Sequence, residues 1–159
     1  MVPTKRLSCW LTHLWLEYAS TLWDPYQHNL IDNLEMIQRR CARFVLNRYG
    51  RTDSVSEMLQ ILKWQTLEER RRNARLKMFY NIYNNYIPTQ ELKSVLQAPH
   101  YISKNDHHSK VRLISAKHKV FQNSFFPKTI CDWNKLPLEL INSNNIRIFN
   151  NRLSKIKVL

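Results

Sequence analysis

The chain has a single glycine, Gly50, among its 159 residues, and this scarcity restricts the possible folds more than any other feature. Loops that cradle phosphates or dinucleotides need several closely spaced glycines, so such sites are excluded by count. Architectures with many tight β-turns also usually need more glycine. We therefore expect an all-α fold of about six or seven helices, packed as a single domain over residues 1–159.

Charge is the second unusual feature. There are 25 Lys and Arg against 12 Asp and Glu, which gives a net charge of +13. Residues 101–159 alone hold 11 of the basic and three of the acidic residues. Such a field attracts polyanions and makes their binding salt-dependent. Nucleic acid is the expected partner, with an anionic membrane surface or a solvated surface without a partner as alternatives. No small-molecule substrate and no cofactor are expected.

The cysteines and the start of the chain bear on location. Cys9, Cys41 and Cys131 are an odd number with no paired spacing, which favours a reducing, intracellular compartment. The apolar start is interrupted by His13 and Glu17, and it is too short and polar for a membrane span. We expect no membrane association, and a nuclear location if the chain acts on DNA.

Apolar periodicity predicts a helix over residues 29–47, with Asp24 and Pro25 as a possible start and Tyr49-Gly50 as its end. Its narrow apolar stripe consists of Leu30, Leu34, Ile37, Cys41, Phe44 and Val45. Two capping boxes follow. Ser54 with Glu57 opens a short helix through residue 62, and a Thr-x-x-Glu box at residues 66–69 opens a helix through residue 84.

The rest of the chain is less regular. A short helix is expected within residues 88–96, and a basic, irregular segment over residues 99–119. A helix over residues 121–135 is either disturbed by Pro127 or begins there, and Pro137 ends it. Ser143 or Asn144 caps a terminal helix, whose apolar positions are Ile146, Phe149, Leu153 and Ile156.

Four strings in a fixed order carry a resemblance. They are LEYASTLWDPY (residues 16–26), IDNLEMIQRRCARFV (31–45), residues 54–83 with WQTLEERRRNARL inside them, and SFFPKTICDWNKLP (124–137). This ordered set resembles the region downstream of the polymerase palm in endonuclease–reverse transcriptase polyproteins of non-LTR, jockey-like retrotransposons. The resemblance covers residues 16–149, and residues 1–15 depart from it.

In that family the catalytic aspartates and the endonuclease lie upstream of this region, and this chain has no adjacent Asp-Asp pair. The resemblance therefore implies a part of an RNA-directed DNA polymerase that is not itself an enzyme and that follows RNA or DNA beside the polymerase. The alternative is a structural module that docks on the upstream reverse transcriptase domain, through the stripe of residues 30–45 and the aromatic N-terminal segment of about residues 7–21.

Three basic groups are candidate nucleic-acid contacts, since arginine forks match phosphate geometry. The first lies in the helix over residues 66–84, the second beside the stripe of residues 30–45, and the third in the irregular segment. Their members are Arg70, Arg71, Arg72, Arg75 and Lys77; Arg39, Arg40 and Arg43; and Lys110, Arg112, Lys117 and Lys119. Solvated helix faces held by ion pairs, and a mobile loop, are the alternatives.

Other chemistry finds little support. No Cys-x2-Cys or Cys-His spacing accompanies His107, His108 and His118, so no metal site is expected. No motif orders the Cys, His and Asp residues for nucleophilic catalysis. The large aromatics that could stack on bases are Trp64, Trp133, Phe125 and Phe126. Packing in the core is the favoured role for side chains of this size.

Overall fold

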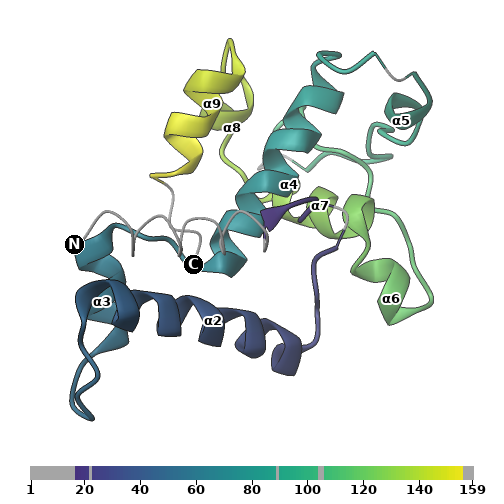
Figure 1. The fold of residues 1–159 in the computed structure, drawn as a ribbon. Coiled ribbons are helices and arrows are strands. Elements are labelled where there is room, and N and C mark those ends of the chain that lie inside the picture. Colours follow the sequence, from purple (N-terminus) through teal and green to yellow (C-terminus); the bar gives the residue numbers. More distant parts are fainter. Residues whose placement is uncertain (1–16, 22, 89, 104–105, 156–159) are drawn as a thin grey trace. The chain divides into compact units, whose positions relative to one another are not determined.

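The computed structural model describes residues 17–21, 23–88, 90–103 and 106–155. Every regular element in these ranges is a helix, which confirms the all-α fold (Figure 1). The ranges contain eight helices, α2 to α9, slightly more than expected because three of them span only four or five residues. The chain forms two compact units, Met1–Arg71 and Arg72–Leu159, and their boundary falls inside helix α4.

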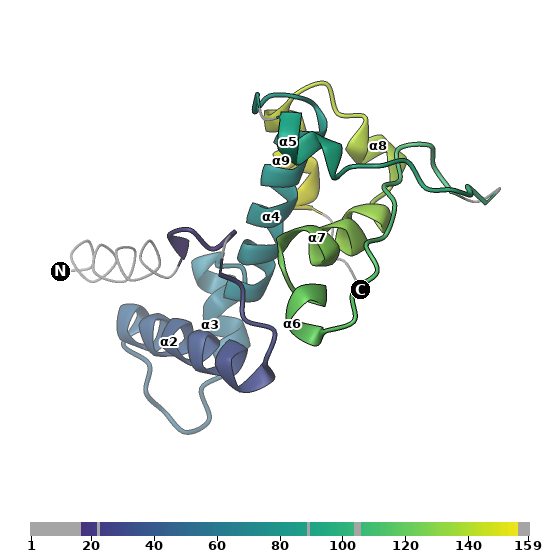
Figure 2. The ribbon, with the colours of Figure 1, turned by 90° about the vertical axis from the view of Figure 1, so that its right-hand side faces the viewer.

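The N-terminal unit contains α2 (His28–Leu46), α3 (Val55–Leu62) and the first turns of α4 (Leu67–Tyr83). Helices α2 and α3 lie side by side (Figures 1 and 2). Both predicted N-caps are confirmed. The Glu57 amide donates to Ser54 Oγ over 3.4 Å, and the Glu69 amide donates to Thr66 Oγ1 over 3.2 Å. Each bond satisfies an amide that has no partner within its helix.

Helix α2 differs in detail from its prediction. The range predicted from apolar periodicity is right within one residue at each end, but Asp24 does not start the helix, which begins after Gln27. The helix ends at Leu46, and Asn47, with a left-handed φ of 53°, is its C-cap ahead of Gly50. The apolar stripe is wrong at Leu30 and Phe44, which are 45% and 40% exposed, whereas Val45 at its C-terminal end is buried as predicted. The buried side chains of α2 are Gln38, Ala42 and Val45. Gln38 is buried because its amide donates to the Gln65 carbonyl over 2.8 Å, a partner that periodicity does not reveal.

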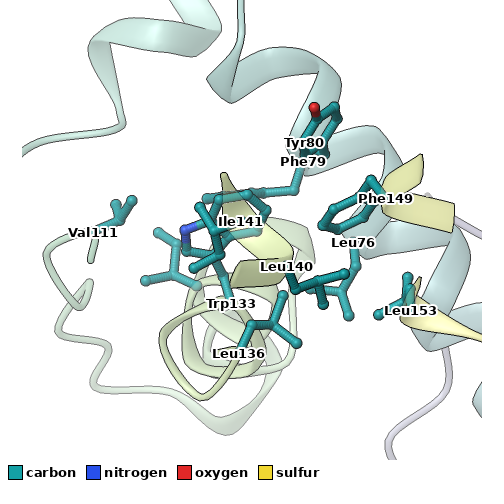
Figure 3. Close-up of a cluster of buried hydrophobic side chains, with 11 residues drawn as sticks. Leu76, Phe79, Tyr80, Val111, Trp133, Leu136, Leu140, Ile141, Phe149 and Leu153 are labelled. Atoms are coloured by element: carbon teal, nitrogen blue, oxygen red, sulfur yellow. The ribbon is translucent and has the colours of Figure 1, made fainter. Parts of the chain in front are cut away.

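The C-terminal unit combines most of α4 with five helices, several of them very short. These are α5 (Gln90–Ser94), α6 (Lys119–Gln122), α7 (Phe125–Asn134), α8 (Leu138–Ile141) and α9 (Ile146–Leu153). Side chains from α4, α7, α8 and α9 gather into one apolar core (Figure 3). The core consists of Leu76, Phe79, Tyr80, Val111, Ile130, Trp133, Leu136, Leu140, Ile141, Phe149 and Leu153.

Aromatic contacts join the helices of this core. The Trp133 ring centroid lies 4.9 Å from that of Phe79 and 5.2 Å from that of Tyr83. Tyr80 stacks on Phe149 at 4.3 Å, and the Tyr80 hydroxyl donates to the carbonyl of Ser143. A buried tyrosine usually needs such a partner for its hydroxyl. The core therefore depends on α4 aromatics packed on α7 and α9.

The string SFFPKTICDWNKLP proves to be a packing unit. Pro127 lies buried in the first turn of α7, where its missing N–H costs nothing, and Pro137 is the N-cap residue of α8. Helix α7 thus ends at Asn134, before Pro137. Helix α9 is capped by Asn145 Oδ1, which accepts from the Ile148 amide over 2.9 Å. The cap is therefore not Ser143 or Asn144, as predicted, but the next residue. Residue 156 lies outside the described residues.

Candidate nucleic-acid interface

The basic residues of α4 divide between the two units through their ion pairs. Arg70 Nε lies 2.6 Å from Glu17 Oε1, and Arg71 Nε lies 3.1 Å from Asp24 Oδ1, both within the N-terminal unit. The Arg71 side chain is only 1% exposed. Burial lowers the pKa of the Arg71 guanidinium, and the charges of Glu35 and nearby carboxylates oppose this shift.

Within the C-terminal unit, Asp132 of α7 forms ion pairs with two arginines of α4. Arg75 Nη2 lies 2.9 Å from Asp132 Oδ2, and Arg72 Nε lies 3.6 Å from the same oxygen. Only 4% of the Arg75 side chain is exposed. Burial lowers the pKa of Arg75, while the hydrogen bond and charge of Asp132 oppose the shift. This pair fastens α4 to α7.

These positions change the α4 candidate group. Arg71 and Arg75 are buried in ion pairs, so the expectation that they reach phosphates is corrected. Their carboxylate partners come from positions 47 and 57 residues away in the chain, and helix periodicity cannot indicate such distant partners. Arg70 and Arg72 are half-buried, and Lys77 alone of the group is exposed.

The α2 candidates lie partly at the surface. Arg39 and Arg40 are exposed and Arg43 is half-buried. They belong to a unit with ten Lys and Arg against eight Asp and Glu, a net charge of only +2. The N-terminal unit therefore carries too little excess positive charge to attract a polyanion strongly to these three arginines.

The C-terminal unit carries nearly all of the excess charge. It has 15 Lys and Arg against four Asp and Glu, a net charge of +11. Of the third candidate group, Arg112, Lys117 and Lys119 are exposed, whereas Lys110 is half-buried and paired with Asp106. Further exposed cations that the sequence analysis did not single out are Lys93, Lys135, Arg147, Arg152 and Lys155. Counting the charged residues of each unit separately would have drawn attention to these cations. That count requires the unit boundary at residues 71–72, which the sequence alone does not indicate.

Two side chains of α7 hold the basic segment in place. Asn134 Oδ1 accepts from the Val111 amide over 2.9 Å, and Asn134 Nδ2 donates to the Val111 carbonyl over 2.7 Å. The Trp133 indole donates to the Ser109 carbonyl over 3.2 Å, and Figure 3 shows its nitrogen on the side of Val111. The segment predicted to be irregular, residues 99–119, is irregular in its described part up to residue 118, and Lys119 begins α6. It is nevertheless fastened to the core at residues 109–111.

The aromatic candidates behave as packing residues. Trp133 is fully buried, and Phe125 and Phe126 are partly buried against the core, which confirms the favoured interpretation for these three. Trp64 is half-buried. The exposed aromatic rings of the C-terminal unit are instead Tyr86, Tyr101 and Phe121. Phe121 lies two residues after Lys119 and four after Lys117 in the sequence, and that spacing could have identified it.

No cluster of three or more potential metal ligands occurs among the described residues. Within the same ranges, no helix is long and apolar enough to cross a membrane. No protein-family model, curated protein or solved structure matches the chain.

His107 gives the basic segment a predicted pH response. Burial lowers the pKa of His107 below its ordinary 6.5, and Lys110 and His108 lower it further, against the opposing effects of the Leu136 backbone and of Asp106. The folded state therefore favours neutral His107, and the unfolded chain takes up the proton at higher pH. This contribution to stability is complete above pH 6.5 and is lost as the pH falls through the lowered value.

We expect the melting temperature of the protein to fall from pH 7.5 to pH 5, and to fall less in His107→Gln. Asp106 does not contribute to the change between pH 7.5 and pH 5, because hydrogen bonds from Lys110 and Ser103 lower its pKa below 3.8. His118→Gln, at an exposed position, is the control for loss of an imidazole. Parallel pH profiles for the protein and His107→Gln would contradict the assignment.

Proposed function

We propose that this chain is a non-catalytic C-terminal part of a non-LTR retrotransposon reverse transcriptase, and that it binds RNA or DNA phosphates. The observation that carries the binding proposal is the charge of +11 in the C-terminal unit. A unit with this imbalance gains free energy by releasing counterions from a polyanion. The retrotransposon origin is supported by the four ordered strings of the sequence.

The binding surface is proposed to consist of exposed cations of the C-terminal unit, with Arg112, Lys117 and Lys119 at its centre. Residues 107–131 contain five Lys and Arg and no Asp or Glu. The nearest acids on either side, Asp106 and Asp132, are each engaged by cations of the unit. No carboxylate within this stretch of sequence opposes an approaching phosphate.

The test is binding of fluorescent RNA and DNA oligonucleotides to the full chain across a potassium chloride series. Replacing Arg112, Lys117 and Lys119 together by Gln should reduce the slope of log affinity against log salt by about two, since each single-strand phosphate contact contributes about 0.7. The three side chains are exposed, so the fold should persist, as circular dichroism would verify.

The matched control replaces Arg39, Arg40 and Arg51 by Gln, which removes three exposed charges from the N-terminal unit. The C-terminal variant should lose more affinity than this control. A salt-independent affinity, or equal losses in both variants, would contradict the proposal. Self-association without oligonucleotide binding would instead favour the docking alternative, for which the exposed Leu30, Met36 and Phe44 of α2 are the support.

A further inference from the structure

Helix α6 presents apolar and basic side chains together at the surface. Val120 is 69% exposed and Phe121 is 50% exposed. Lys117, His118 and Lys119, which precede them, are exposed as well. The half-exposed phenyl ring of Phe121 and the exposed cations that precede it in the sequence match a ligand that has both a flat apolar face and negative charge.

The backbone of α6 is held by several hydrogen bonds although the helix is short. The amides of Gln122 and Asn123 donate to the His118 and Lys119 carbonyls over 3.0 and 3.1 Å, and the Ser124 amide donates to the Phe121 carbonyl over 3.0 Å. Side chains add three more bonds. Asn123 Nδ2 donates to the Lys119 carbonyl over 2.7 Å, Gln122 Nε2 to the Ala116 carbonyl over 3.0 Å, and Ser124 Oγ to the Phe121 carbonyl over 2.7 Å. Phe121 thus stands on an ordered turn, so little backbone entropy is lost when a ligand covers it.

We propose that α6 binds single-stranded nucleic acid, with one unpaired base stacked on Phe121 and the adjoining phosphates held by Lys117 and Lys119. This inference rests on the proposed function and adds a preference for single strands to it. In a duplex the faces of the bases cover one another, so Phe121 has no face to stack on. In a single strand every base offers a face, and basic grooves with stacking aromatics bind such strands with little regard to sequence.

An anionic membrane offers similar chemistry but fits α6 less well. Helices that lie in a membrane surface present a long apolar face over several turns. Helix α6 has four residues. Stacking of one base needs only one ring, so the size of α6 suits a nucleotide.

The experiment compares a 12-nucleotide single strand carrying 2-aminopurine with a 12-base-pair duplex, both bound to the full chain at fixed salt. Phe121→Leu should weaken single-strand binding about 5- to 100-fold and leave duplex binding unchanged. It should also abolish the quenching of 2-aminopurine fluorescence that stacking produces. Phe121→Trp should retain both properties. Tyr86→Leu, which alters another exposed ring of the same unit, should change neither.

The outcomes separate this inference from the proposed function. Equal affinity for single strand and duplex, or unchanged single-strand binding in Phe121→Leu, would overturn the inference and leave phosphate binding in place. Absence of all oligonucleotide binding would overturn both. Phe121-dependent binding to phosphatidylserine vesicles, without a single-strand preference, would overturn the inference in favour of a membrane.

Discussion

Arg75→Met is expected to lower the free energy of unfolding of the C-terminal unit by about 3–5 kcal/mol, the usual cost of removing one partner of a buried ion pair. Arg75 is 4% exposed and lies 2.9 Å from Asp132, which is itself 20% exposed. The substitution leaves Asp132 with Arg72 at 3.6 Å, a longer and more exposed contact. A loss of this size is a large fraction of the stability of a small unit.

Urea denaturation followed by circular dichroism would measure the change. Lys77→Met, an exposed position on the same helix, is the control and should cost less than about 0.5 kcal/mol. The double variant Arg75→Met with Asp132→Asn should recover part of the loss, because it also removes the carboxylate charge that only the longer contact with Arg72 still compensates. Wild-type stability in Arg75→Met would show that the pair does not hold α4 to α7.

This prediction affects how binding should be tested. Charge reversal at Arg71 or Arg75 is the experiment that the α4 sequence invites. With both side chains buried in ion pairs, lost binding in such variants would follow from unfolding and would say nothing about phosphate contacts.

Trp133→Ala is expected to destabilise the C-terminal unit by about 3–5 kcal/mol, the range for large aromatic truncations in cores. Trp133 is fully buried and contacts the rings of Phe79, Tyr83 and Phe149. Its removal leaves a cavity that the surrounding rings can fill only in part. It also removes the indole donor from the Ser109 carbonyl, so the basic segment loses one of its attachments.

Trp133 is also the only tryptophan after residue 71, so the emission that is lost in Trp133→Phe reports on this unit. In the unsubstituted protein, urea should change Trp133 emission together with the circular dichroism of the C-terminal unit. Trp133→Phe, which keeps an aromatic ring, should lose less stability than Trp133→Ala. Equal losses in the two variants would mean that the hydrogen bond, rather than the packing of the ring, provides the stability.

Local chemistry explains how much of the fold could be predicted. Helix α2 was predicted within one residue at each end, and the N-caps at Ser54 and Thr66 were identified, because these features depend on neighbouring residues. The limits of prediction appear at Asp24. Its place before Pro25 indicates an N-cap, but in the structure it pairs with Arg71, a contact that depends on the tertiary fold.

The candidate site was predicted only in part for the same reason. Arg112, Lys117 and Lys119 were identified because they are basic residues of the irregular segment, and they are exposed. Arg71 and Arg75 were misplaced because a buried arginine and a phosphate-binding arginine look alike in sequence. Phe121 was overlooked because large aromatics are most often core residues, although it lies nearer to Lys117 and Lys119 in the sequence than Phe125 does.

The side chain of Asn134 makes the hydrogen bonds to Val111 that a neighbouring β-strand would make in a sheet. Its amide group returns both the N–H and the C=O of Val111, the same pair of bonds that a strand partner exchanges across an antiparallel ladder. The irregular basic segment thereby gains, at Val111, the pair of backbone hydrogen bonds that it would otherwise make only in a sheet. A carboxylate at this position has two acceptor oxygens and no donor. In the near-isosteric Asn134→Asp variant, one oxygen could still accept from the Val111 amide, but the other would face the Val111 carbonyl, which is also an acceptor.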